Sequence, residues 1–168
     1  MKAYLEKLAE AVGHRLLARQ ALVATAESCT GGWIAQVLTS VPGSSLWFDR
    51  GFVTYSNQAK QEMLGVAPAT LAAHGAVSAP VVTEMVVGAL SHSQARVTLA
   101  VTGIAGPGGG SEDKPVGTVY LAWAWRDQAP LIQRRQFAGD REEVRRQTVC
   151  VALEHLIELL DADADADS

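Results

Sequence analysis

Short apolar strand segments that alternate with helical segments constrain the fold of this chain more than any other feature. The apolar, partly β-branched runs Leu22–Ala26 and Val97–Val101 predict buried strands. Apolar residues at helical spacing within Tyr4–Arg19 predict a helix before the first of these runs. Because strands alternate with helices along the chain, we expect an α/β sandwich built on a mostly parallel sheet.

The remaining segments extend this pattern. A further strand is expected at Gly51–Tyr55, and the strands Val116–Trp125 and Leu131–Phe137 form an antiparallel hairpin that makes the sheet mixed. Helices are expected at Trp33–Leu38, Asn57–Leu64, Thr70–Gly75 and Ser78–Ala89, and from Asp140 to Leu160. Asn57 is the predicted N-cap of its helix, and Asp140 with Glu143 forms a variant of the capping box.

Size and composition indicate one domain. The 168 residues are 48% apolar and 19% charged, which suits a single globular domain over residues 1–160. The alternating Asp and Ala residues of 161–168 predict a disordered acidic tail. Two cysteines, Cys29 and Cys150, are too few for a disulfide framework.

Charge and hydropathy exclude several classes of function. The net charge of -4 and the pI of about 5.5 do not fit a protein that binds a nucleic-acid backbone. The segment Met1–Glu10 lacks the apolar core of a signal peptide, and no run reaches the roughly 18 apolar residues of a membrane span. Four scattered histidines have no metal-ligand spacing. We therefore expect a cytoplasmic protein with a small-molecule partner, no metal and no cofactor.

Three loops follow the predicted parallel strands. They are Glu27–Gly32, Tyr55–Asn57 and Thr102–Gly110. In a parallel sheet the carboxyl ends of the strands meet at one edge, where ligands bind. These loops therefore predict the position of a binding site.

A serine and a lysine in neighbouring segments carry the strongest chemical signal. Ser45 follows a Pro-Gly turn, and Lys60 is the third helical residue if Asn57 is the N-cap. The helix dipole and burial in a closed site would both lower the pKa of this lysine, so that it can act as the base for a serine nucleophile. The alternative interpretation is a turn serine, a solvated surface lysine and, in Tyr55, a strand aromatic. The pattern alone does not separate Ser44 from Ser45.

Two loops supply candidate ligand-binding groups. In Glu27–Gly32, either Ser28 or Thr30 caps the following helix, and the backbone N–H groups can face an anion. The loop Thr102–Gly110 holds five glycines, which allow the backbone to approach a ligand closely. It lacks the Gly-Lys-Ser/Thr ending of a Walker loop. The alternative for this second loop is a flexible connection.

Two arginines on the last helix are candidates for binding a phosphate. Arg141 and Arg145 lie four residues apart and share a helix face. The alternative is a solvated face on which they pair with Glu142 or Glu143. Cys29 has no histidine beside it in its loop, which favours a small buried residue over a nucleophile.

Seven motifs, in order along the chain, resemble the CinA C-terminal domain family. They are Ala26–Gly32, Pro42–Ser45, Gly51–Asn57 with Lys60 and Leu64–Val66, Gly75–Ser78, Thr102–Pro107, Lys114–Val119 and Phe137–Arg145. The resemblance runs from about residue 4 to residue 160. It implies a three-layer α/β/α sandwich of the CinA-like, anticodon-binding-domain-like kind with a five-stranded mixed sheet.

The resemblance also implies an activity. Stand-alone members of the family are nicotinamide-nucleotide amidases, which hydrolyse nicotinamide mononucleotide to nicotinate mononucleotide and ammonia in pyridine nucleotide salvage. By motif position, Ser45 would be the nucleophile, Lys60 its base and Tyr55 a support for the pair. A homo-oligomer without metal or cofactor is implied. The residues that would hold the ligand are Ser28, Thr30, Gly31, Thr102, Gly103, Gly106, Arg141 and Arg145.

Two other functions stay open at this point. The first is a non-catalytic nucleotide-binding regulatory module of the competence- or damage-inducible type. The acidic pI argues against direct contact of such a module with DNA. The second is hydrolysis of a different amide. Release of ammonia from nicotinamide mononucleotide would distinguish these alternatives from the amidase.

Overall fold

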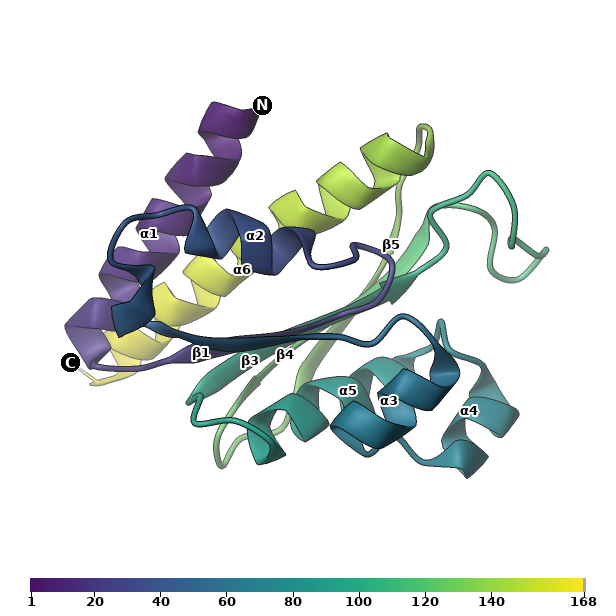
Figure 1. Ribbon diagram of the computed structural model, residues 1–168, viewed down its shortest axis with the longest axis horizontal. Coiled ribbons are helices and arrows are strands. Elements are labelled where there is room, and N and C mark those ends of the chain that lie inside the picture. Colours follow the sequence, from purple (N-terminus) through teal and green to yellow (C-terminus); the bar gives the residue numbers. More distant parts are fainter. Residues whose placement is uncertain (168) are drawn as a thin grey trace.

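A five-stranded mixed sheet of order β2-β1-β3-β4-β5 lies between two layers of helices in the computed structural model, which describes residues 1–167 (Figure 1). The strands are β1 (Val23–Glu27), β2 (Phe48–Val53), β3 (Val97–Gly103), β4 (Thr118–Trp125) and β5 (Leu131–Gln136). The helices are α1 (Lys2–Arg19), α2 (Trp33–Thr39), α3 (Asn57–Leu64), α4 (Pro68–His74), α5 (Ala79–Ser91) and α6 (Arg141–Asp167), with a 3-10 turn η1 (Ser44–Leu46). The predicted α/β/α fold is confirmed.

The pairing of the strands decides where the loops emerge. Strand β1 is parallel to both β2 and β3, and its last residue, Glu27, lies opposite Val53 and Val101. Strands β3, β4 and β5 are antiparallel to one another. The loops that follow β1, β2 and β3 therefore leave the same edge of the sheet, as predicted.

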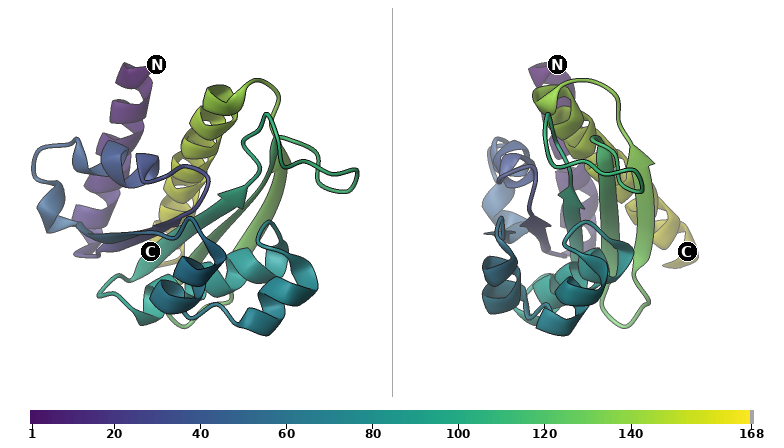
Figure 2. Two further views of the ribbon diagram at one scale, coloured as in Figure 1. Left: turned by 45° about the vertical axis from the view of Figure 1, so that its right-hand side comes forward. Right: turned by 90° about the vertical axis from the view of Figure 1, so that its right-hand side faces the viewer.

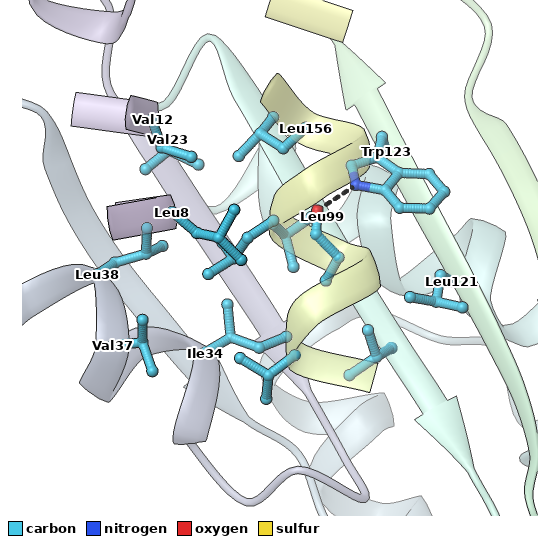
Figure 3. Packing of buried hydrophobic residues seen from close by; sticks show 14 of the residues in the cluster. Leu8, Val12, Val23, Ile34, Val37, Leu38, Leu99, Leu121, Trp123 and Leu156 are labelled. Carbon is cyan, nitrogen blue, oxygen red and sulfur yellow. Dashed lines mark hydrogen bonds between the residues drawn. The ribbon is translucent and has the colours of Figure 1, made fainter. Parts of the chain in front are cut away.

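Each face of the sheet is covered by its own set of helices. Helices α1, α2 and α6 lie on one face, and α3, α4 and α5 lie on the other (Figures 1 and 2). The first layer buries the larger apolar cluster, in which the Trp123 indole N–H donates to the Ala152 carbonyl at 3.0 Å (Figure 3). The other layer buries a smaller apolar cluster that includes Leu64, Val81 and Met85. Burial of one large aliphatic side chain contributes about 1.5–3 kcal/mol, so these two clusters provide the rigid support for the loops at the edge.

Strand β2 and helix α3 differ in detail from the prediction. Strand β2 begins at Phe48 rather than Gly51, because the polar residues Asp49 and Arg50 of this edge strand hide its apolar pattern. The N-cap of α3 is Ser56, whose hydroxyl accepts the N–H of Ala59 at 3.0 Å. Asn57 is therefore the first helical residue, and Lys60 is the fourth rather than the third.

Helix α6 begins as predicted and extends further. The Asp140 carboxylate accepts the N–H of Glu143 at 2.9 Å, which is the predicted cap. The helix continues to Asp167, through most of the segment whose composition predicts disorder. In this segment Asp161 and Asp163 form ion pairs with Arg15 and Arg19 of α1, contacts that the composition alone does not reveal. The last predicted tail residue, Ser168, lies outside the described residues. Among the described helices, none is both long and apolar enough to cross a membrane.

Candidate functional site

A cavity of about 290 Å³ opens at the edge where the three parallel strands end. Its lining includes the side chains of Ser28, Tyr55, Lys60, Thr102 and Arg141, together with the glycine loop after β3. Convergent polar groups in a small cavity are the usual sign of a ligand site. A second cavity of about 380 Å³ lies near the N-terminus and has a mainly apolar lining. The first cavity is therefore the candidate site.

Lys60 is the central side chain of this cavity. It projects from α3 toward the sheet and is only 1% exposed. Its Nζ lies 3.0 Å from the Ser28 hydroxyl oxygen, 2.8 Å from the Thr54 carbonyl oxygen and 3.2 Å from the Tyr55 carbonyl oxygen. No carboxylate in the described part of the chain pairs with it.

These surroundings make the neutral form of Lys60 easier to reach than it is in water. Burial lowers the pKa of Lys60 below its ordinary value of 10.5, because desolvation penalises the charged form. A neutral amine has two hydrogens and one lone pair. In the structure Nζ donates to the Ser28 oxygen; in a neutral amine whose two hydrogens go to the carbonyls of Thr54 and Tyr55, the lone pair would face the Ser28 hydroxyl. The arrangement can therefore remove a proton from that serine.

Ser28 reaches the cavity because β1 ends one residue before it. Its backbone N–H donates to the Val101 carbonyl of the neighbouring strand at 3.2 Å, and the residue is 7% exposed. The chain then turns into α2 through Gly31 and Gly32, whose φ values of 60° and 101° favour glycine. The short loop thus holds the serine side chain at the carboxyl edge of the sheet.

The predicted contact between Ser45 and Lys60 is wrong. Ser45 is exposed in the turn η1 that precedes β2, whereas Lys60 follows β2. Trp47, at the end of that turn, accepts the N–H of Val23 at the start of β1. The turn that carries Ser45 and the cavity that contains Lys60 therefore lie at opposite ends of β1. The length of this strand is about 13 Å at roughly 3.3 Å per residue. Ser45 does not line the cavity.

Tyr55 and Arg141 form the outer rim of the cavity. Tyr55 is 62% exposed, and its hydroxyl oxygen accepts a hydrogen bond from an Arg141 N–H at 3.2 Å. Arg141 also donates to the Gly106 carbonyl at 2.8 Å. Tyr55 touches Lys60 through its backbone carbonyl rather than through its hydroxyl. The guanidinium of Arg141 is therefore the cation at the mouth of the site.

Several predicted ligand-binding residues support the walls of the cavity. The Thr102 hydroxyl donates to the Ala76 carbonyl at 3.0 Å, which ties two walls together. Thr30 is fully buried, and its hydroxyl donates to Glu27 at 2.5 Å. Arg145 lies over the Trp33 ring and donates to the carbonyls of Cys29 and Thr30.

Of the predicted ligand-binding residues, five line the cavity and three do not. Those that line it are Ser28, Thr102, Gly103, Gly106 and Arg141, and those outside are Thr30, Gly31 and Arg145. Of the two candidate arginines, Arg141 lines the cavity and Arg145 does not.

Sequence reasoning did not identify the apolar wall of the cavity. Ala76, Val77, Ile104 and Ala105 line it; the first two belong to the motif Gly75–Ser78 and the last two to the predicted loop Thr102–Gly110. Cys29 also lines the cavity, and burial raises the pKa of its thiol to about 12. A thiol that stays protonated is a poor nucleophile. Within residues 1–167, no group of three or more His, Cys, Asp or Glu residues is placed to hold a metal ion.

Comparisons with known proteins agree with this fold. The model of the CinA C-terminal domain matches residues 5–160. A nicotinamide-nucleotide amidohydrolase, PncC, of Escherichia coli strain K12 is 57% identical over 152 residues, which cover 90% of this chain and 92% of that protein. A relative of the same name from Pseudomonas putida is 55% identical over 152 residues, covering 90% of this chain and 94% of that protein. The crystal structure of the competence/damage inducible protein CihA from Agrobacterium tumefaciens has a TM-score of 0.90 at 49% identity, covering 92% of this chain and 94% of that one.

Proposed function

Because the chain belongs to the CinA C-terminal domain family, we propose that it is a nicotinamide-nucleotide amidase with Ser28 as nucleophile and Lys60 as base. The observation that carries this proposal is the 3.0 Å contact between the Lys60 amine and the Ser28 hydroxyl inside the cavity. The names of the relatives supply the substrate class, nicotinamide mononucleotide.

The first half of the reaction forms an acyl-enzyme. The Ser28 oxygen attacks the carbonyl carbon of the nicotinamide amide while Lys60 takes the hydroxyl proton. Backbone N–H groups of the glycine loop stabilise the negative oxygen of the tetrahedral intermediate, at about 3–4 kcal/mol for each well-placed donor. Lys60 then gives its proton to the amide nitrogen, the carbon–nitrogen bond breaks, and ammonia leaves. The product is a nicotinoyl ester of Ser28.

The second half releases the acid. A water molecule replaces ammonia beside Lys60, which removes a proton from it as the water oxygen attacks the ester carbon. The ester bond breaks, and the Ser28 oxygen recovers the proton from Lys60. One water is consumed for each amide, and nicotinate mononucleotide and ammonia are formed. No group besides the serine and the lysine has to carry a proton in these steps.

The two ends of the substrate match two parts of the cavity. The apolar wall of Ala76, Val77 and Ile104 suits the flat pyridine ring. The Arg141 guanidinium at the rim suits the 5′-phosphate, to which it can donate charge-assisted hydrogen bonds. Arg145 does not line the cavity, and its guanidinium donates to the carbonyls of Cys29 and Thr30, so it supports the loop instead.

An ammonia-release assay on the purified protein tests this function. We expect turnover of nicotinamide mononucleotide, much weaker turnover of the riboside without the phosphate, and none in Ser28→Ala. Binding of the nucleotide without ammonia release would contradict the proposal and favour a regulatory binding module. The homo-oligomeric state implied by the resemblance and a role in pyridine nucleotide salvage stay predictions. Sedimentation of the purified protein tests the former.

A further inference from the structure

We propose that Glu27 is a positioning residue that holds the nucleophile and its base at their observed separation. This inference rests on the proposed function, since it concerns the same Ser28 and Lys60 pair. Glu27 precedes Ser28 in the chain, and its side chain does not line the cavity. It therefore acts on the reaction through its neighbours, without contact to the substrate.

The Glu27 carboxylate fastens the serine loop to the start of α2. The side chain is 1% exposed and accepts three hydrogen bonds. Their donors are the Thr30 hydroxyl at 2.5 Å, the Ile34 N–H at 2.8 Å and the Ala35 N–H at 3.0 Å. The N-cap position of α2 is Gly32, which has no side chain to accept these N–H groups. The carboxylate takes over the capping function and so fixes both ends of the loop that carries Ser28.

The backbone carbonyl of Glu27 holds the lysine side of the pair. It accepts the Thr54 N–H at 2.8 Å, at the point where β2 ends. The Thr54 carbonyl in turn accepts the Lys60 amine at 2.8 Å. A closed ring of contacts thus runs from Glu27 through Thr54 and Lys60 to the Ser28 hydroxyl and back along the chain. Among the four residues of this ring, Glu27 is the one whose side chain forms hydrogen bonds with α2.

The hydrogen bonds around Glu27 suit a carboxylate rather than an amide. Burial raises its pKa, while the hydrogen bonds from Thr30, Ile34 and Ala35 oppose that rise. All three donors point at the carboxylate oxygens, so an amide in its place would direct an NH₂ group at one of the donors. Replacement of Glu27 by Gln therefore keeps the size of the side chain and breaks the cap.

The experiment compares Glu27→Gln with Glu84→Gln, a matched control. The Glu84 carboxylate accepts the Ala67 N–H at 2.8 Å at the start of α4, and it does not line the cavity. Each variant loses a hydrogen bond that a backbone N–H at the start of a helix donates to the carboxylate, so we expect a lower melting temperature in both. Only Glu27→Gln should lower kcat, on the order of 10²-fold, because small misplacements of reacting groups have effects of that size. Its KM should stay within a factor of about 3, since the ligand contacts remain.

Two further measurements keep the inference separate from the proposed function. Covalent labelling of Ser28 by a fluorophosphonate reports the reactivity of the serine without the substrate, and it should slow in Glu27→Gln but not in Glu84→Gln. Labelling of a protein that releases no ammonia would therefore refute the substrate and leave the positioning role standing. Should Glu27→Gln not fold, Thr30→Val removes one of the three bonds and should lower kcat to a smaller extent. Unchanged kcat and labelling in the folded variant would overturn the inference.

Discussion

The amine nitrogen of Lys60 lies 3.0 Å from the hydroxyl oxygen of Ser28, although 32 positions separate the two residues in the sequence. The parallel pairing of β1 with β2 brings them together, because each residue follows the carboxyl end of its strand. Two carbonyl oxygens, of Thr54 and Tyr55, complete the surroundings of the amine. The contact between Ser28 and Lys60 therefore depends on the direction and register of these two strands.

Replacement of Ser28 and of Ser45 should have opposite results. Ser28→Ala removes the proposed nucleophile, and we expect kcat for ammonia release to fall by at least about 10³-fold. Ser45→Ala changes an exposed turn residue outside the cavity and should leave kcat and KM unchanged. Steady-state kinetics with nicotinamide mononucleotide measure both. Loss of activity in Ser45→Ala with normal turnover in Ser28→Ala would reverse the assignment.

The activity should rise with pH as Lys60 loses its proton. Burial lowers the pKa of Lys60, so kcat/KM should rise with pH and level off below pH 10.5, the ordinary lysine value. The same group affects stability. Between the lowered pKa and 10.5, the unfolded chain binds more protons than the folded protein, so the free energy of unfolding increases with pH over that interval.

A comparison with Lys60→Met separates the contribution of this lysine from that of other groups. The variant should have no measurable amidase activity, and its free energy of unfolding should lack the increase with pH toward 10.5 that Lys60 contributes. Chemical denaturation at a series of pH values provides the measurement. A pH dependence that is identical in both proteins would show that a different group titrates.

The serine that contacts Lys60 could have been predicted from strand direction, and the wrong pairing of Lys60 with Ser45 follows from leaving that argument out. Ser45 precedes β2 and Lys60 follows it, so a parallel sheet places them at opposite edges. Ser28 follows the neighbouring strand and reaches the same edge as Lys60. The helices and strands themselves were predictable, because their apolar periodicity reflects which face is buried.

Other features of the site depend on packing that no local pattern records. The burial of Lys60 results from α3 lying against the sheet, and the pattern of its first turn fits an exposed lysine equally well. The buried carboxylate of Glu27 is likewise indistinguishable in sequence from a solvated one. Tyr55 approaches Lys60 through its carbonyl, which is independent of residue type. Which groups of different helices and strands meet one another could therefore be learned only from the structure.

The two arginines of α6 should differ in their effect on the recognition of phosphate. Arg141→Ala removes the cation at the rim, and a charge-assisted hydrogen bond contributes about 1.5–3 kcal/mol. We expect its KM for nicotinamide mononucleotide to rise about 10- to 100-fold. Turnover of the riboside should not change. Arg145→Ala should lower the melting temperature without altering the preference for the phosphate, since Arg145 bonds the carbonyls of Cys29 and Thr30.

Cys29 should be dispensable for the reaction although it adjoins the proposed nucleophile, Ser28. Burial raises the pKa of its thiol to about 12, so the thiol stays protonated at neutral pH and reacts slowly with alkylating reagents. Treatment with iodoacetamide at about pH 8 should leave the activity intact, and Cys29→Ala should keep most of the wild-type kcat. Mass spectrometry of the treated protein verifies that Cys29 is unmodified. Rapid inactivation with a carbamidomethyl group on Cys29 would contradict this expectation.

Gly88 should be essential for the placement of the helix that carries Lys60. A Cβ atom on Gly88, in α5, would lie 2.0 Å from the carbonyl oxygen of Leu64 at the end of α3. Gly88→Ala gains about 1 kcal/mol in helix propensity, but the two helices must separate, and overpacking of this kind costs about 1–3 kcal/mol or more. We expect a net loss of up to about 2 kcal/mol in the free energy of unfolding. Because α3 then shifts relative to the sheet, kcat should fall as well.

A matched substitution shows whether the contact, rather than the loss of a glycine, is responsible. Gly108 lies in an exposed loop, and a Cβ atom there would meet no heavy atom within 4 Å. Gly108→Ala should therefore change the free energy of unfolding by no more than about 0.5 kcal/mol. Urea denaturation, with the slope of the transition checked for equality, compares the two variants. If Gly88→Ala unfolds at the same urea concentration as Gly108→Ala, the close approach of α5 to α3 is not what positions Lys60.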